Sequence, residues 1–165
     1  MIPRLRMMLA GSALVAAAAV AFAWTMEHWV GLVPCPLCLL ERWPFRIAVV
    51  IGLVGLVLPR PWARLALMLL GLTILADAAI AFVHVGVEHR LWLSPLAACQ
   101  QPHFAGGSIA ERLAQMPARP SVACEDASYV FDWLAVSLAE MNLLFTLAFS
   151  GAIATFLWMT RNSER

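Results

Sequence analysis

Apolar residues in this chain gather into four long blocks. The blocks run over about residues 7–24, 39–58, 65–87 and 138–159. Each approaches the roughly 20 residues that a helix needs to cross a bilayer. The last block opens with Ser137-Leu-Ala-Glu140, a capping box whose side chains satisfy the first free amides of a helix. The pattern predicts an all-α membrane protein, a four-transmembrane-helix bundle forming a single integral membrane domain over residues 1–165.

The longest polar connection covers residues 88–137, between the third and fourth blocks. Within it, Ser108-Ile-Ala-Glu111 forms a second candidate capping box. Ile109, Leu113 and Met116 follow at i, i+4 and i+7 spacing, which gives one apolar stripe on a helix. We therefore expect a short amphipathic helix in this connection, lying in the membrane surface or packed on the end of the bundle.

Arginines orient the predicted bundle. They flank the two chain ends and the connection between the second and third blocks: Arg4, Arg6, Arg60, Arg64, Arg161 and Arg165. Residues 27–34 carry no Lys or Arg, and residues 88–137 carry five acidic residues against three arginines. The positive-inside rule places the Arg-rich ends in the cytoplasm. The connections over residues 25–38 and 88–137 then face the opposite side.

Composition supports the membrane assignment. The chain is 62% hydrophobic and 13% charged, with a mean hydropathy of +0.82, whereas soluble domains carry roughly a quarter charged residues. So much apolar surface cannot be buried in a core of this size, which excludes a soluble globular enzyme. The net charge of +1, with no basic cluster, lacks the electrostatic footprint of nucleic-acid binding.

The first block has a second interpretation. Arg4 and Arg6, the apolar run and Ala21-Phe22-Ala23 also resemble a secretory signal peptide with its cleavage site. The run is longer than the apolar core of a typical signal peptide, so we favour a retained helix. Cleavage would leave the other three spans oriented as before.

All four cysteines fall on the predicted outer side: Cys35 and Cys38 in the first connection, Cys99 and Cys124 in the long one. If this side is a bacterial periplasm, it is the compartment where disulfides persist. In that case the protein is a bacterial inner-membrane protein with both termini cytoplasmic and with its cysteine-bearing loops in the periplasm.

Cys35-Pro-Leu-Cys38 is a Cys-X-X-Cys motif at the beginning of the second block. Pro36 suits the first helical turn, where its missing N–H costs nothing. Cys38 would lie in that turn, where the positive end of the helix dipole favours a thiolate. Arg42, four residues on, shares a helix face with Cys38. We therefore expect the pKa of Cys38 to be lowered, as a reactive sulfur requires.

Other uses of the four cysteines fit less well. Cys99 and Cys124 are too far apart for a two-pair zinc site, and no histidine spacing completes a ligand set, so no metal site is expected. A c-type haem site needs a histidine where Leu39 stands. Structural disulfides in a membrane-anchored interaction protein remain an alternative, and a metal transporter is a weaker one. Repeated thiol oxidation needs an electron acceptor, and by elimination membrane quinone is the candidate.

Several motifs together resemble the disulfide bond formation protein B (DsbB) family. They are Pro34-Cys-Pro-Leu-Cys-Leu-Leu-Glu-Arg42, His84-Val-Gly-Val-Glu88, the Cys99…Cys124 pair and Ser137-Leu-Ala-Glu-Met-Asn142. The resemblance covers nearly the whole chain. It implies a four-helix membrane bundle that re-oxidises a periplasmic DsbA-type thioredoxin-fold oxidase and passes the electrons to ubiquinone, or to menaquinone without oxygen.

The resemblance also implies roles for single residues. A cysteine of the partner would attack Cys99, and Cys124 would pair with Cys99 at rest and exchange with Cys35 during turnover. Cys38 would face the quinone as the reactive thiolate. Arg42 would stabilise that thiolate and the reduced quinone oxygen.

A histidine near the quinone is also implied. We prefer His84 to His89, because His-x-x-x-Glu at the span end matches better, and we expect it to contribute to quinone binding. Met141 departs from the tryptophan usual in the family. Glu41 is expected to pair locally with Arg42 or with Arg46, and Asp77 to make a hydrogen bond between helices or lie at the interface.

Overall fold

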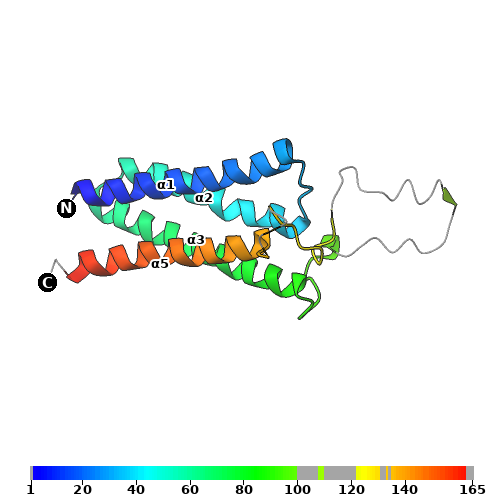
Figure 1. Ribbon diagram of the computed structural model, residues 1–165. Helices are drawn as coiled ribbons and strands as arrows, with labels where there is room; N and C mark the ends of the chain where they lie inside the picture. Colours follow the sequence, from blue (N-terminus) through cyan, green and yellow to red (C-terminus); the bar gives the residue numbers. More distant parts are fainter. Residues whose placement is uncertain (1, 100–107, 110–121, 131–132, 134, 163–165) are drawn as a thin grey trace.

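Four long helices dominate the computed structural model, which describes residues 2–99, 108–109, 122–130, 133 and 135–162 (Figure 1). They are α1 (Ile2–Thr25), α2 (Pro36–Val57), α3 (Arg60–Glu88) and α5 (Leu138–Asn162). The described residues form no strand, so the predicted all-helical class is confirmed. The four apolar blocks lie within these helices to within a residue, and the helices extend beyond them because polar end residues continue the same backbone hydrogen bonding.

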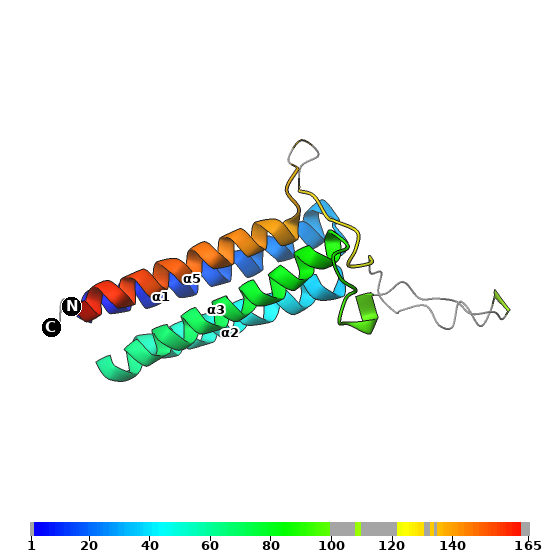
Figure 2. The same ribbon diagram turned by 90° about the horizontal axis from the view of Figure 1, so that it is seen from below.

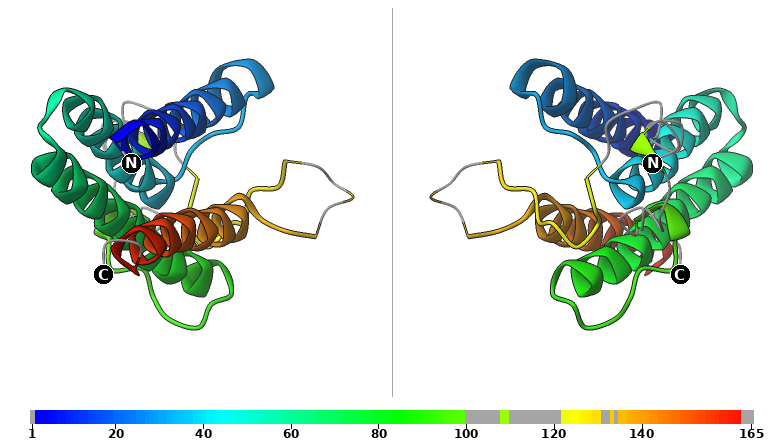
Figure 3. Two further views of the ribbon diagram at one scale, coloured as in Figure 1. Left: turned by 90° about the vertical axis from the view of Figure 1, so that its left-hand side faces the viewer. Right: turned by 90° about the vertical axis from the view of Figure 1, so that its right-hand side faces the viewer.

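The helices pack in chain order, α1 against α2, α2 against α3, and α3 against α5, as the view along the bundle shows (Figure 3). Small residues allow α1 and α2 to approach closely. A Cβ added at Gly52 would lie 2.8 Å from the Cβ of Ala13, and one at Gly55 would lie 2.9 Å from a methyl of Leu9. Such small-residue contacts are typical of helices packed in a membrane, where van der Waals contact replaces the hydrophobic effect.

The helices are long and apolar enough to make this a membrane protein. Three candidate spans are found in the described part of the chain: Pro3–Val30, Arg60–Glu88 and Leu138–Asn162. Many large apolar side chains on the outside of the bundle are exposed, including Val57 and Leu72. Helix α2 is not among these candidate spans, because the charged residues Glu41, Arg42 and Arg46 interrupt its outer half.

The two ends of the bundle differ in chemistry. The N- and C-termini lie at one end, and the beginning of α2, with Cys35 and Cys38, lies at the other (Figures 1 and 2). Beyond α1 the chain makes a π-helical turn, η1 (Met26–Val30), and reverses at Gly31, whose φ of 81° suits glycine. Cys99 closes a short 3₁₀ helix, η2 (Ala97–Cys99).

The predicted capping box at the beginning of α5 is confirmed. The backbone N–H of Glu140 donates to Oγ of Ser137 at 3.2 Å, and the N–H of Ser137 donates to Oε2 of Glu140 at 2.9 Å. The predicted amphipathic helix cannot be compared in the same way. Of its residues only Ser108 and Ile109 are described, and Leu113 and Met116 lie outside the described residues.

Candidate functional site

The Cys-X-X-Cys motif caps helix α2. Cys35 is the N-cap residue with an extended backbone, and Pro36 occupies the first turn as expected. Both thiols are free, and their sulfur atoms lie 2.8 Å apart. Cys35 is buried at 2% exposure, whereas Cys38 is half-buried. The pair is therefore held side by side, with one sulfur enclosed and the other reachable.

The contacts at this turn favour a thiolate on Cys35, whereas the sequence pattern predicted it on Cys38. The backbone N–H of Cys38 donates to Sγ of Cys35 at 3.1 Å. Together with the hydrogen bond from the Cys38 thiol, this amide lowers the pKa of Cys35. The cap geometry is the reason, because an N-cap side chain receives the free amides of the first turn, whereas a residue inside that turn supplies one.

Arg42 makes a contact that the sequence did not indicate. Its Nη1 lies 2.5 Å from Oε2 of Glu27, and its Nη2 donates to the carbonyl of Ala23 at 3.5 Å. Both partners belong to the end of α1 and the turn after it, so the guanidinium ties α1 to α2. The Glu27 pairing depends on this close approach and leaves no signal in local sequence.

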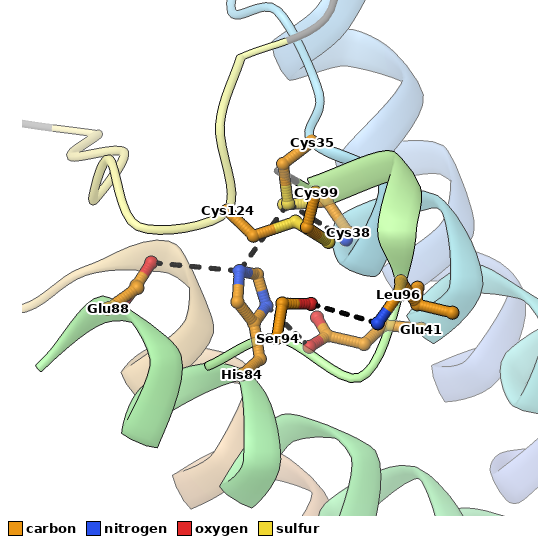
Figure 4. Close-up of a disulfide and its surroundings, with 9 residues drawn as sticks. All are labelled: Cys35, Cys38, Glu41, His84, Glu88, Ser94, Leu96, Cys99 and Cys124. Carbon is orange, nitrogen blue, oxygen red and sulfur yellow. Dashed lines mark hydrogen bonds and ion pairs between the residues drawn. A yellow bond between two sulfur atoms is a disulfide. The ribbon is translucent and has the colours of Figure 1, made fainter. Parts of the chain in front are cut away.

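His84 brings helix α3 to the cysteines (Figure 4). Its Nε2 lies 3.4 Å from Sγ of Cys35, and its Nδ1 lies 2.7 Å from Oε1 of Glu41. The expected pairing of Glu41 with Arg42 or Arg46 is wrong among the described contacts, because Glu41 faces into the bundle toward α3. His84 and Glu41 are both buried, so this contact is shielded from water.

The hydrogen-bonded chain continues to helix α5. The side-chain amide of Asn142 donates to Oε2 of Glu41 and to Oδ2 of Asp77, both at 3.1 Å. Asp77 is fully buried, and the inter-helix hydrogen bond expected for it is found. The described groups thus link α2, α3 and α5 from Cys35 to Asp77.

The second cysteine pair forms a disulfide beside the first. Cys99 and Cys124, 25 residues apart, are bonded to each other. They pack in one buried cluster with Cys35, Leu37 and Val87. Figure 4 shows the disulfide lying next to Cys35 and Cys38. All four sulfur atoms therefore gather at one place, at the end of the bundle opposite the termini.

A cavity of about 460 Å³ is lined in part by Cys38. It is bounded by α1, α2 and α5, and most of its lining is apolar. Its polar wall is formed by Cys38, Glu41, Arg42, Asn142 and Glu27. Cys38 thus reaches both the cluster of sulfur atoms and a largely apolar chamber.

The remaining candidate residues differ in their position relative to the cavity. Met141 lines the cavity, where its flexible side chain occupies part of the wall. His84 does not line the cavity, so a direct part in quinone binding has no support from its position. His89 is exposed, its Nε2 lies 2.9 Å from Oε1 of Glu140, and no described contact joins it to a cysteine.

Comparison with known proteins identifies the family. The sequence profile of disulfide bond formation protein DsbB matches residues 5–157. A disulfide bond formation protein B of Azoarcus sp. is 32% identical over 161 residues, covering 87% of this chain and 84% of the relative. Another, of Marinobacter nauticus, is 37% identical over 105 residues, covering 63% of this chain and 59% of the relative.

A further relative extends the comparison. An uncharacterised protein of Rickettsia prowazekii is 26% identical over 148 residues, covering 88% of this chain and 84% of the relative. No solved structure gives a significant match. With a family profile that spans most of the chain, and with cysteine pairs brought together at one end of a helical membrane bundle, the protein belongs to the DsbB family of disulfide-bond-forming membrane thiol oxidoreductases.

Proposed function

We propose that the protein re-oxidises a periplasmic DsbA-type thiol oxidase and passes the electrons to membrane quinone. The observation that carries this proposal is the position of the Cys35–Cys38 pair. On one side it packs against the Cys99–Cys124 disulfide, and on the other Cys38 lines the largely apolar cavity. Electrons that enter through one disulfide therefore have a short route to a membrane-soluble acceptor.

The thiol steps balance without an added reagent. A cysteine thiolate of the reduced partner attacks Cys99, forming a mixed disulfide and releasing the Cys124 thiolate. The second cysteine of the same partner molecule then attacks that mixed disulfide, which releases the oxidised partner and leaves Cys99 reduced. We assign a Cys35–Cys38 disulfide to the resting enzyme. In the next exchange this disulfide oxidises Cys99 and Cys124, and Cys35 and Cys38 become the dithiol seen in the structure.

The cavity fits a quinone. A quinone ring is apolar on its faces and accepts hydrogen bonds at its oxygens, and the lining combines apolar walls with the donor Arg42. Arg42 would hold a ring oxygen, with Cys38 beside the ring. When bound, quinone supplies the oxidising power, because it accepts two electrons and two protons for each disulfide formed.

His84 and Glu41 provide a proton route from the buried thiol. His84 Nε2 lies 3.4 Å from Sγ of Cys35 and can accept its proton. The other ring nitrogen of His84 contacts Glu41, which itself lines the cavity. We therefore assign His84 to proton transfer rather than to quinone binding. Oxidation of the two thiols releases two protons, and this route carries one of them to the cavity wall.

The charge distribution supports four spans with both termini in the cytoplasm of a bacterial inner membrane. The two termini and the connection between α2 and α3 share one end of the bundle, and Arg4, Arg6, Arg60 and Arg64 lie near it. The positive-inside rule places this end in the cytoplasm and the cysteines in the periplasm. In this arrangement α2 is the fourth span.

Turnover with and without quinone tests the proposal. The purified chain is mixed with a reduced DsbA-type protein, and oxidation of the partner is followed together with loss of quinone absorbance, with ubiquinone added or withheld. We expect quinone-dependent multiple turnover. Cys38→Ala should form the mixed disulfide through Cys99 once and consume no quinone. No turnover with several thioredoxin-fold donors, while both cysteine pairs stay intact, would favour structural disulfides instead.

A further inference from the structure

The dithiol form of the site presents three metal-ligand atoms to one point. The sulfur atoms of Cys35 and Cys38 and Nε2 of His84 all lie within 4.8 Å of one another. Two thiolates and a neutral imidazole are a ligand set that Zn²⁺ prefers. The sequence predicted no metal site because His84 stands 49 residues after Cys35, and only the packing of α3 against α2 brings them together.

Glu41 prepares the histidine for this role. Its Oε1 lies 2.7 Å from Nδ1 of His84, so the ring hydrogen is held on Nδ1 and the lone pair of Nε2 is left toward the sulfurs. Metal-bound histidines almost always have such a partner on the other ring nitrogen, because it fixes the tautomer and the ring orientation. His84 therefore has both features of a metal-binding histidine, which are nearby thiols at Nε2 and a carboxylate partner at Nδ1.

The distances require only a small adjustment. With Zn–S of about 2.3 Å and Zn–N of about 2.0 Å, a tetrahedral site places two sulfurs about 3.8 Å apart and a sulfur and a nitrogen about 3.5 Å apart. Cys35 Sγ is already 3.4 Å from His84 Nε2. The two sulfurs, now 2.8 Å apart, need to separate by about 1 Å. Rotation of the half-buried Cys38 side chain supplies this movement.

A fourth ligand position is available. Oε1 of Glu88 lies 3.9 Å from Nε2 of His84, on the same helix. Its other oxygen accepts a hydrogen bond from Ser137, which holds the carboxylate near the site. The Glu88 oxygen is outside the group of atoms that lie within 4.8 Å of one another, so a water molecule near this carboxylate completes four-coordinate geometry.

We propose that the reduced protein binds Zn²⁺ through Cys35, Cys38 and His84, and that the bound ion stops turnover. Binding replaces the two thiol protons, which are released, and involves no change of oxidation state. While the ion is bound to both thiolates, they are not available for oxidation. The oxidised protein, with its Cys35–Cys38 disulfide, has lost both sulfur ligands and does not bind the ion. The binding claim stands alone, and the inhibition claim rests on the proposed function.

Cd²⁺ titration tests the binding, because thiolate coordination gives a charge-transfer absorption band. The full chain is used in detergent with Cys99→Ala and Cys124→Ala, so that Cys35 and Cys38 are its only thiols. We expect one Cd²⁺ per chain, displaced by Zn²⁺, and none after oxidation of the pair. Glu41→Gln should lower the affinity about 10- to 100-fold, the usual cost of losing such a partner, and His84→Ala should lower it further.

His89→Ala is the matched control, because this exposed histidine lies near the same end of the bundle but outside the cluster. Unchanged Cd²⁺ affinity in His84→Ala, or absence of one-to-one binding in the folded protein, would overturn the site. Inhibition is measured separately in the unsubstituted chain, where Zn²⁺ should stop quinone-dependent turnover and a chelator restore it. Undiminished turnover at saturating Zn²⁺ would overturn inhibition, whereas failure of the proposed function would show as no turnover without metal.

Discussion

The side-chain amide of Asn142 donates a hydrogen bond to Oδ2 of Asp77 at 3.1 Å, across the contact between α5 and α3. The same nitrogen serves Glu41 on α2, so one amide holds two acidic side chains of different helices. Asp77 is fully buried. Burying an acidic group inside a membrane domain costs free energy unless the group is paired. Because it pairs acidic groups of α2 and α3, this amide of α5 joins three helices.

Asn142→Ala should therefore destabilise the bundle. Loss of the amide leaves two acidic side chains without this donor, and an unsatisfied buried polar group costs about 1–3 kcal/mol. Thermal unfolding in detergent should show a lower midpoint than the parent. Ser150→Ala is the control, because this α5 hydroxyl bonds only to the Leu147 carbonyl of its own helix among the described contacts. Equal midpoints for the two variants would argue against the junction.

Removal of the Cys38 thiol should change how Cys35 titrates. The hydrogen bond from Cys38 is the main cause of the lowered pKa of Cys35, and the backbone amide adds to it. Cys38→Ala should raise the pKa of Cys35, so less thiolate exists at neutral pH and modification by a small thiol reagent becomes slower there, but not at high pH. Mass spectrometry of the Cys35 peptide across a pH series measures the midpoint.

Cys38→Ser provides the matched comparison for this titration. A hydroxyl still donates a hydrogen bond to the sulfur, so the midpoint for Cys35 should lie between those of the parent and Cys38→Ala. A Cys35 midpoint that is the same in all three proteins would show that the Cys38 side chain does not control the thiolate.

The parts of the fold that sequence predicted correctly depend on residues close together in the chain. The capping box of Ser137 and Glu140 joins residues three apart, and the apolar blocks needed only the length and composition of a helix. Cys35 and Cys38 are likewise neighbours across one helical turn. The spacing of nearby residues was sufficient to predict each of these features.

The parts that were wrong or missed depend on how helices face one another. Glu41 was assigned to arginines on its own helix, but its described partners are His84 and Asn142, 43 and 101 residues away. Glu27 was missed as the partner of Arg42 for the same reason. The rotation of a helix about its axis decides such contacts, and apolar blocks exposed to lipid on many sides fix this rotation poorly.

Arg42 should matter for quinone use through its place at the cavity wall. Arg42→Ala removes a donor and the tie to Glu27, so we expect a raised apparent KM for ubiquinone, measured by loss of quinone absorbance. Arg42→Lys should raise the apparent KM less, because lysine keeps the positive charge although it lacks the planar guanidinium. Glu27→Gln should give a smaller rise if Glu27 only positions the guanidinium.

Arg46→Ala is the control for these variants. Its guanidinium lies over the ring of Trp43, 5.5 Å from the centroid, and it does not line the cavity. A rise in the apparent KM of Arg46→Ala as large as that of Arg42→Ala would point to general charge rather than to the cavity contact.

Gly86 should be intolerant of a side chain because Trp92 packs directly on it. A Cβ added at Gly86 would overlap the indole ring. That ring is fixed by a hydrogen bond from its Nε1 to the carbonyl of Val83 at 3.0 Å and by contact with Phe82. Trp92 thereby folds the chain back over the end of α3, just before the segment that carries Cys99.

Gly86→Ala should displace the indole and cost about 1–3 kcal/mol of stability, the usual penalty for overpacking. The mixed disulfide with the partner should also form more slowly, because Cys99 follows Trp92 closely in the chain. Thermal unfolding and the rate of mixed-disulfide formation measure the two effects. Gly151→Ala is the matched control, since nothing lies within 4 Å of its added Cβ and alanine favours the helix. If both variants keep the parent's unfolding midpoint, the indole moves aside freely and does not hold the Cys99 segment in place.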